Sequence, residues 1–372
     1  MSDKVKPFQL LNRRYAGSLA LPAFEPNDFA TGWLDRSADL LGATRVDLVR
    51  WLDAGGEALL QVDLDREPRR LMLALHQWAE RPEEWGSLKP LLGPARLAAD
   101  KRVSFCPLCM AEDVRRRRLP YFRAQWTWAW LTHCPNHLVP LFRWDILRDA
   151  GTGERSLPAA WVAQGLHKRC RDLGVADQER AKRIQGTLRV ARAARGWIGD
   201  DSAFAWFWRQ QVAFEQEVHQ LRCGRTVGDI LGGFENRQFL LHAIDDLAVL
   251  FSTNFNRSER EPWSSSWKSY LGPDALFGGF SKSPAFTGVP AMDAMTQLAD
   301  PRARRTVMAM IVRILLAFRT DLFCSGPGAV AEPGFNALTT DLKSLPDAAK
   351  SWCAERWERW PNVVRRGVEK SL

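Results

Sequence analysis

The sequence has no long hydrophobic run, few cysteines and no apolar leader. Its most apolar stretch, residues 307–318, contains Arg313 and is shorter than the ~18 residues of a membrane-spanning helix. Lys4 and Lys6 near the N-terminus precede no apolar segment, so we expect no signal peptide. Seven cysteines among 372 residues are too few for a disulfide scaffold. These absences predict a soluble, cytoplasmic protein.

The sequence also lacks the common enzyme motifs. It contains no Gly-x4-Gly-Lys-Ser/Thr phosphate loop, no Gly-x-Gly-x-x-Gly, no His-Glu-x-x-His and no Gly-x-Ser-x-Gly. The adjacent pair Asp245 and Asp246 lies in a helical apolar pattern, where successive side chains diverge, so it does not predict a two-metal site. We therefore predict no catalytic residues and a protein that is not an enzyme.

Length and composition predict a globular chain of several domains. Hydrophobic residues make up 46% of the sequence and charged residues 26%, which is typical of folded rather than disordered proteins. At roughly 100–200 residues per domain, 372 residues correspond to two or three domains. We place the predicted domains at residues 1–100, 101–150 and 151–372.

The positive charge is concentrated in the second hundred residues. The whole chain has a formal net charge of +9. Residues 1–100 carry 13 Lys+Arg and 15 Asp+Glu, whereas residues 101–200 carry 19 and 9. A basic segment attracts polyanions and adds phosphate affinity that does not depend on base sequence. This segment is therefore a candidate for binding nucleic acid, and a solvated surface is the alternative.

The first hundred residues contain the pattern of three short helices. Apolar residues recur every three or four positions within 29–41 and 46–52, with Gly42 between the two stretches. Thr44 is placed to cap the second helix, and a third is expected over residues 69–80. This arrangement predicts a helix-turn-helix module. Its acidic balance favours contact with a protein over docking on phosphate.

Residues 151–372 are predicted to be mostly helical. We expect helices from Ser202 to about Gly224, from Gln238 to Phe251, from Asp300 towards Arg319, and over 346–360. Asp300 followed by Pro301 is a start signal, because Asp caps a helix and Pro suits its first position. Residues 254–293 are rich in Gly, Ser and Pro and predict a loop. The predicted fold class is mainly α.

Two short cysteine and histidine motifs carry the strongest chemical signal. Cys106 and Cys109 form a Cys-x2-Cys pair, and Cys134 and His137 form a Cys-x2-His pair. Two such knuckles supply the four ligands of a tetrahedral structural Zn²⁺. Because four protein ligands leave no open coordination position, the predicted zinc is structural rather than catalytic. The segment is predicted to be a zinc ribbon with a small β-hairpin.

The other cysteines and histidines near this motif fit a metal less well. His133 lies beside Cys134 and could compete as a ligand, but only His137 keeps the x2 spacing. The alternative to a metal site is that the cysteines pack as small hydrophobic residues. The four remaining cysteines have no comparable partner and are predicted to be such buried residues: Cys170, Cys223, Cys324 and Cys353.

Aromatic and basic residues lie between and after the knuckles. Trp126, Trp128 and Trp130 alternate, which predicts that they share one face of a strand. They could stack nucleic-acid bases, but a small zinc module needs a core, and we favour core packing. The run of arginines cannot be core, so we predict that it contacts phosphate. The predicted contacts are Arg115, Arg116, Arg117, Arg118, Arg123, Lys168, Arg169, Lys182 and Arg183.

Several stretches around the knuckles share a family pattern. They are Phe105 to Asp113, Tyr121-Phe122-Arg123 with Trp126, Thr132 to His137, Val139-Pro140-Leu141 and, upstream, Gly32 to Ala38. Together they resemble the TniQ family, the target-selection proteins of certain bacterial transposons, over about residues 20–145. Where the family usually has Pro-Gly-Glu-Ser-Leu before its opening helix, this chain has Pro26 to Ala30 with a different sequence.

The resemblance implies a non-enzymatic adapter for transposition. Such a protein marks a DNA target, directly or through an RNA-guided CRISPR effector complex, and recruits an AAA+ ATPase and then a transposase. The resemblance also implies a homodimer. One alternative is a stand-alone zinc-containing transcriptional regulator, which would bind an operator without an ATPase partner. Another is a metal-dependent nuclease, which would cleave DNA.

Overall fold

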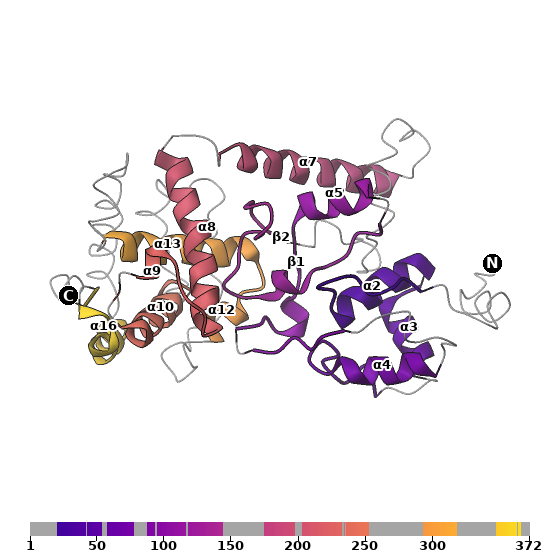
Figure 1. The fold of residues 1–372 in the computed structure, drawn as a ribbon, viewed down its shortest axis with the longest axis horizontal. Helices are drawn as coiled ribbons and strands as arrows, with labels where there is room; N and C mark the ends of the chain where they lie inside the picture. The colour runs from indigo at the N-terminus through magenta and orange to yellow at the C-terminus, as the bar shows by residue number, and fades with distance from the viewer. Residues whose placement is uncertain are drawn as a thin grey trace. The chain divides into compact units, whose positions relative to one another are not determined.

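The structure, a computed structural model, is mainly α-helical, as predicted from the sequence (Figure 1). It describes residues 21–41, 43–53, 58–77, 88–93, 95–116, 118–143, 175–197, 203–232, 234, 236–252, 293–317, 347–362 and 364–365. Within these ranges no helix is both long enough and apolar enough to cross a membrane. The chain divides into two compact units, which are described separately.

The first unit comprises residues 1–93, 105–126 and 143–190. Its described N-terminal part holds α2 (Ala30–Leu41), α3 (Arg45–Leu52) and α4 (Pro68–His76), close to the three helices predicted. Apolar side chains from these helices form one core, including Trp33, Leu34, Leu48, Val49, Leu52, Leu71 and Leu75. The three helices are confirmed, and the helix-turn-helix interpretation stays a prediction. Gly42 lies outside the described residues.

Local signals explain where these helices begin. The Thr44 hydroxyl accepts a hydrogen bond from the Asp47 backbone N–H at 2.9 Å, which confirms Thr44 as the cap of α3. Pro68 occupies the first turn of α4, where its missing N–H costs nothing.

The segment before α2 is tied to that helix by two buried side chains. The Trp33 indole N–H donates to the Pro22 carbonyl at 2.8 Å. The Arg36 guanidinium forms a buried ion pair with Asp28 at 2.6 Å. The Trp and Arg of the family-like opening helix therefore hold the entering chain in place.

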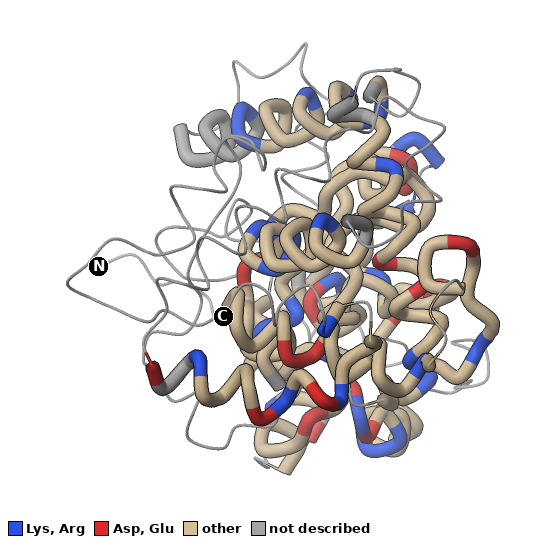
Figure 2. The backbone as a smooth tube through the Cα atoms, turned by 90° about the vertical axis from the view of Figure 1, so that its left-hand side faces the viewer, with Lys and Arg blue, Asp and Glu red and all other residues tan. Residues whose placement is uncertain are grey.

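Two helices and two strands have bounds that matter for the sites below. The first helix is α5 (Pro107–Arg115), which follows the short strand β1 (Ser104–Phe105). Strand β1 pairs with β2 (Phe142–Arg143), the small β element expected around the knuckles. The second helix is α7 (Val175–Trp197), which has 23 residues, lies along the top of Figure 2 and carries exposed Lys and Arg in its described part.

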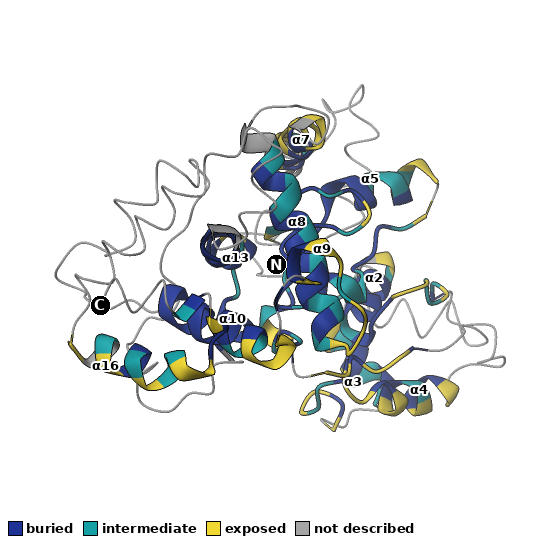
Figure 3. Cartoon of the chain, turned by 60° about the vertical axis from the view of Figure 1, so that its left-hand side comes forward, coloured by how far each residue is buried: buried dark blue, intermediate teal, exposed yellow. Residues whose placement is uncertain are grey.

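The second unit comprises residues 94–104, 127–142 and 191–372. Its helices are α8 (Ala203–Arg222), α9 (Asp229–Gly232), α10 (Arg237–Ser252), α12 (Asp293–Gln297), α13 (Pro301–Ala317) and α16 (Asp347–Arg356), and its 3₁₀ turns are η2 (Ala99–Lys101) and η7 (Trp357–Arg359). Helices α10 and α13 pack together and are mostly buried (Figure 3). The predicted loop at 254–293 lies outside the described residues, apart from residue 293.

Helix α13 shows how the sequence signals operate in this unit. The Asp300 carboxylate accepts the Arg302 backbone N–H at 2.8 Å, so the predicted cap and the Pro301 start are confirmed. Arg313, which interrupts the apolar run, is buried with its guanidinium carbon 3.9 Å from the centre of the Phe207 ring. This cation–π contact is one of the interactions that the buried guanidinium makes.

The three alternating tryptophans do not form a strand, so that prediction was wrong. Residues Ala124–Thr127 form the 3₁₀ helix η3, and Trp128 pairs only through an isolated bridge to Arg96. Trp126 and Trp130 are nevertheless fully buried, which confirms the core interpretation for these two rings. Trp128 is only partly buried and lies under Arg96, whose guanidinium carbon is 3.8 Å from its ring centre.

Candidate metal centre and basic residues

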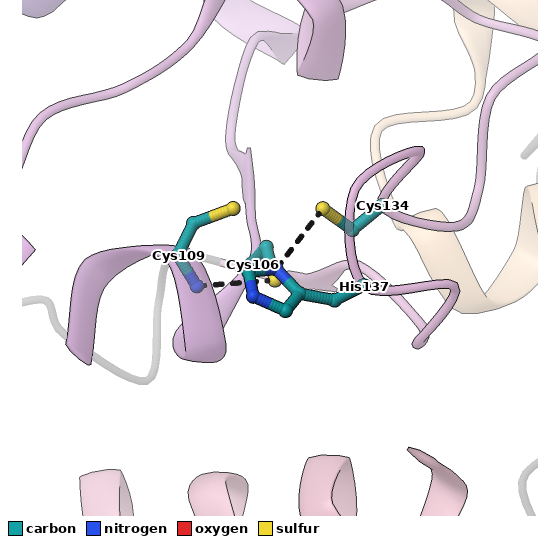
Figure 4. A group of neighbouring side chains, drawn as sticks. All are labelled: Cys106, Cys109, Cys134 and His137. Carbon is teal, nitrogen blue, oxygen red and sulfur yellow. Dashed lines mark hydrogen bonds between the residues drawn. The ribbon is translucent and has the colours of Figure 1, made fainter. Parts of the chain in front are cut away.

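The four predicted zinc ligands come together. Cys106, Cys109, Cys134 and His137 are all buried, and their ligand atoms lie within 4.8 Å of one another (Figure 4). The edge of a tetrahedral zinc–thiolate site is about 3.8 Å, from a Zn–S bond of about 2.3 Å. Three thiols and one imidazole, gathered this closely and shielded from water, suit a structural Zn²⁺. This grouping supports a metal-binding site.

The first pair is built at the start of α5. Cys106 is the N-cap residue in extended conformation, and Pro107 occupies the first helical turn. The Cys106 sulfur accepts the Cys109 backbone N–H at 3.5 Å. The Cys-Pro sequence therefore begins a helix that brings the second sulfur back towards the first. The same N–H···S contact stabilises a thiolate, the form that binds a metal.

The second pair is held by a tight turn. The Cys134 carbonyl accepts the Leu138 N–H at 2.7 Å, and the Cys134 N–H donates to the Val139 carbonyl at 2.8 Å. Leu138 closes the turn in the left-handed region with φ of 56°. The Cys134 sulfur then lies 3.7 Å from Nδ1 of His137. The x2 spacing thus places both ligands on one side of the turn.

His133, the competing candidate, points to a different partner. Its Nδ1 lies 3.0 Å from a carboxylate oxygen of Glu215, and it is absent from the Cys/His cluster. Its ring packs edge-on against Trp208, with ring centres 4.5 Å apart. The grouping of the side chains therefore favours His137, as its spacing predicted.

Glu215 on α8 is a buried carboxylate that supports the second knuckle. It accepts the backbone N–H of Thr132 at 2.8 Å and that of His133 at 3.1 Å. The Thr132 hydroxyl also donates to it. Burial acts to raise the pKa of Glu215, but nearby His133 and the Thr132 hydrogen bonds outweigh burial and lower this pKa below its ordinary value. Glu215 thereby fixes the two residues that precede Cys134.

Further side chains of the second unit hold the segments beside the ligands. The Trp208 indole N–H donates to the Leu138 carbonyl at 3.3 Å, and Arg305 donates to the Leu141 carbonyl at 3.4 Å. Arg304, completely buried, donates to the Ser104 hydroxyl at 2.8 Å and to the Leu298 carbonyl at 3.0 Å. Burial lowers the pKa of Arg304 to about 10. These contacts support the chain two residues before Cys106 and around the second pair.

These supporting residues were not predicted from the sequence. The sequence signal for one of them is a pair of polar residues, Gln211 and Glu215, which lie one turn apart in a predicted helix rich in Phe and Trp. A buried acid on an apolar face requires a partner, but the pattern does not say which one.

The predicted arginine run lies at the exposed end of α5. The side chain of Arg115 is 73% exposed and pairs with Glu112 at 3.5 Å. The side chain of Arg118 is 48% exposed and pairs with Glu25 at 3.3 Å. Arg116 is also exposed, and Arg117 lies outside the described residues. The described members of the run are therefore accessible, and their contact with phosphate stays a prediction.

Arg123 differs from the others in being an internal residue. Its side chain is 11% exposed and forms an ion pair with Asp113 at 2.7 Å. Burial acts to lower the pKa of Arg123, but the charges of Cys109 and Asp113 outweigh burial and raise it. Its guanidinium carbon also lies 4.4 Å from the ring centre of Tyr121. We therefore leave Arg123 out of the nucleic-acid surface proposed below.

The remaining predicted residues fall into two groups. Lys182 and Arg183 are exposed on α7, whereas Lys168 and Arg169 lie outside the described residues.

Among the cysteines outside the cluster, Cys353 is buried as predicted, and burial raises its pKa to about 12. Cys223 is exposed, so its predicted burial was wrong; it follows the last residue of α8 and lies beyond the packed face. Cys170 and Cys324 lie outside the described residues.

Comparison with known proteins gives one match. The TniQ family model matches residues 19–141, a range that contains α2 to α5, both knuckles and all four candidate ligands. No curated protein matches the chain, and no solved structure matches it.

Proposed function

We propose that this chain, whose residues 19–141 match the TniQ family model, is a non-enzymatic adapter that selects the target of a transposon. It binds nucleic acid or an RNA-guided CRISPR effector complex at the target. It then recruits an AAA+ ATPase that regulates the transposase. The family match over residues 19–141 is the observation that carries this proposal.

The Cys/His cluster supports an adapter rather than a catalyst. Three sulfurs and one imidazole fill the four positions that zinc takes in structural sites. A catalytic zinc keeps one position for water or substrate. Zinc held by Cys106, Cys109, Cys134 and His137 would therefore contribute folding free energy and supply no reactive water.

The division of charge supports a different part of the chain for each kind of partner. The acidic balance of residues 1–100 suits contact with the ATPase, because it does not favour phosphate. The excess of basic residues over 101–200 suits nucleic acid or a complex that contains RNA. A homodimer belongs to the same proposal, and the mass of the purified chain tests it.

Reconstituted transposition is the decisive experiment. The transposase, the AAA+ ATPase encoded near it and donor DNA are combined with target DNA, with and without this chain. We expect insertions at defined sites only when the chain is present, and we expect the ATPase to co-purify with the chain. Random insertion that the chain does not alter, together with no ATPase binding, would overturn the proposal.

The same purified components distinguish the adapter from the two alternative functions. A transcriptional regulator would bind one operator tightly and would not retain the ATPase. A nuclease would cut the target when the chain and a divalent metal are incubated with DNA alone, whereas an adapter leaves the DNA intact. The genes beside this one provide an early indication, since an adapter is expected beside a transposase and an ATPase.

A further inference from the structure

Helix α7 has one buried side. Ile184, Leu188, Ala191 and Ala194 are buried and recur every three or four residues. Thr187 is buried on the same side, where its hydroxyl donates to the Arg183 carbonyl. These four apolar residues are therefore already used in packing.

The exposed side of α7 is strongly basic. Five exposed residues carry positive charge, namely Lys182, Arg183, Arg189, Arg192 and Arg195. No Asp or Glu occurs between residues 180 and 199, and the acidic residues of the helix, Asp177 and Glu179, belong to its first turns. At 3.6 residues per turn, Lys182 and Arg189 lie opposite the buried side, and Arg192 continues the row. We call Lys182, Arg189 and Arg192 the basic row.

Two glycines lie on the same exposed side. A β-carbon added at Gly186 or at Gly196 would meet no atom within 4 Å. Glycine inside a helix is less favourable than alanine, and nothing in the described packing requires it at these positions. Glycine also lets a ligand approach the backbone closely. The missing side chains leave room beside the basic row for a partner from outside the chain.

We propose that the exposed face of α7 binds the phosphate backbone of duplex DNA without reading its sequence. Lys182 and Arg192 are ten residues apart, which is about 15 Å along a helix. Duplex DNA carries a phosphate charge about every 1.7 Å of its axis, so the basic row meets phosphate along its whole length. The inference rests on the proposed function, in which the chain acts at a DNA target.

The composition of this face separates duplex DNA from other anionic partners. A membrane-surface helix needs a large exposed apolar face, whereas between residues 182 and 196 the exposed apolar residues are only Val190 and Ala193. Single-stranded nucleic acid is held by aromatic rings that stack on bases, and residues 182–196 contain none. Arginine and lysine are side chains that commonly contact phosphate oxygens.

A charge-matched pair of variants tests the proposal. In the first variant the basic row is neutralised by K182Q, R189Q and R192Q. In the control, K89Q, R50Q and R69Q remove the same three charges from exposed positions in the first unit. Fluorescence anisotropy measures the affinity of each full-length protein for a mixed-sequence duplex of about 30 base pairs, between about 50 and 200 mM salt. Circular dichroism verifies that both variants are folded.

The two variants are expected to differ in affinity and in salt dependence. Loss of three phosphate contacts should weaken binding by about tenfold or more and lower the slope of log K against log salt by about 2.7. The control should stay within about twofold of the wild type, because its charges lie elsewhere. An unchanged affinity and slope for the α7 variant would overturn the proposal. The transposition assay would still test the adapter function separately.

Alanine at a glycine of the basic face gives a test that does not depend on removing charge. G186A favours helix formation but places a methyl group where the duplex approaches, so we expect weaker DNA binding with α7 intact. Gly232 in α9 also has open space, and G232A should leave binding unchanged. Equal affinity of G186A and the wild type would contradict close approach of DNA at this face.

Two probes decide which nucleic acid occupies the face. We expect the wild type to prefer the duplex over a single strand of the same length. A preference for the single strand, or no binding to duplex at about 50 mM salt, would overturn the proposal. In the second case ATPase recruitment still tests the adapter function independently, since an adapter can take its specificity from a partner complex.

Discussion

Glu215 and His133 are joined twice, although 82 residues separate them in the sequence. One oxygen of the carboxylate accepts the backbone N–H of His133 at 3.1 Å, and the other lies 3.0 Å from its Nδ1. Because His133 directly precedes Cys134, this connection links α8 to the second half of the metal centre. The helix and the knuckle therefore depend on each other for their conformation.

Removing this carboxylate should destabilise the protein and weaken its hold on zinc. Glu215→Ala leaves the buried N–H groups of Thr132 and His133 without an acceptor, which we expect to cost about 3 kcal/mol of unfolding free energy. Urea unfolding measures that loss, and competition with a chelator measures zinc retention. Glu215→Gln keeps the shape and one acceptor oxygen, so its effect should be smaller.

The matched control for this experiment is a surface acid on another helix of the second unit. Glu355 on α16 has a side chain that is 74% exposed, so Glu355→Ala should change neither stability nor zinc retention measurably. A Glu215→Ala protein with the wild-type unfolding midpoint and wild-type zinc affinity would show that the knuckle forms without α8.

Substituting one metal ligand should release zinc and unfold the centre. Structural zinc binding is coupled to folding, so Cys106→Ser and Cys134→Ser are each expected to lose the metal and to unfold at lower temperature. Metal analysis after dialysis should give one zinc per wild-type chain and none for either variant. Cys223→Ser provides the control, because this cysteine is exposed and outside the cluster.

The outcome for the control and the ligand variants separates two explanations. If both ligand variants stay folded without metal, the alternative interpretation holds, in which the cysteines pack as small hydrophobic residues and bind no metal. If Cys223→Ser also loses zinc, the loss reflects general instability rather than ligation.

Local signals explain why much of the fold was predictable. Thr44 and Asp300 were placed as helix caps from their neighbours alone, and both accept the expected backbone hydrogen bonds. The zinc ligands were likewise predicted from two x2 spacings, because each pair is formed within one turn of chain. Features that depend on three or four consecutive residues can be read directly from the sequence.

Contacts between distant segments could not be predicted in this way. The Arg304–Ser104 hydrogen bond joins residues 200 positions apart, and no local pattern indicates that pairing. The alternation of Trp126 and Trp128 indicated a strand, but an alternation this short also occurs where chain packing imposes a 3₁₀ turn. Burial of the rings was predictable from their size, whereas the backbone beneath them was not.

The cap of α3 offers a small and specific test of the N-terminal unit. Thr44→Ala removes the acceptor for the Asp47 N–H and should lower stability by about 1 kcal/mol. Thr44→Ser keeps the hydroxyl and should retain most of that stability. Equal urea midpoints for the Ala and Ser variants would mean that the capping bond contributes nothing.

His219 should make stability depend on pH. Its ring lies edge-on to Trp128, with centres 4.4 Å apart, and burial with the nearby charges of Arg96 and Arg225 lowers its pKa to about 4. Between about pH 6.5 and about pH 4 the unfolded chain binds a proton that the folded chain does not, so stability should fall as the pH falls through this range. Urea unfolding at several pH values measures the fall. Zinc ligands also bind protons in acid, so the informative quantity is the difference between the wild type and His219→Gln, which should lose less stability on acidification. Parallel pH profiles for the two proteins would mean that His219 has the same pKa in the folded and unfolded chains.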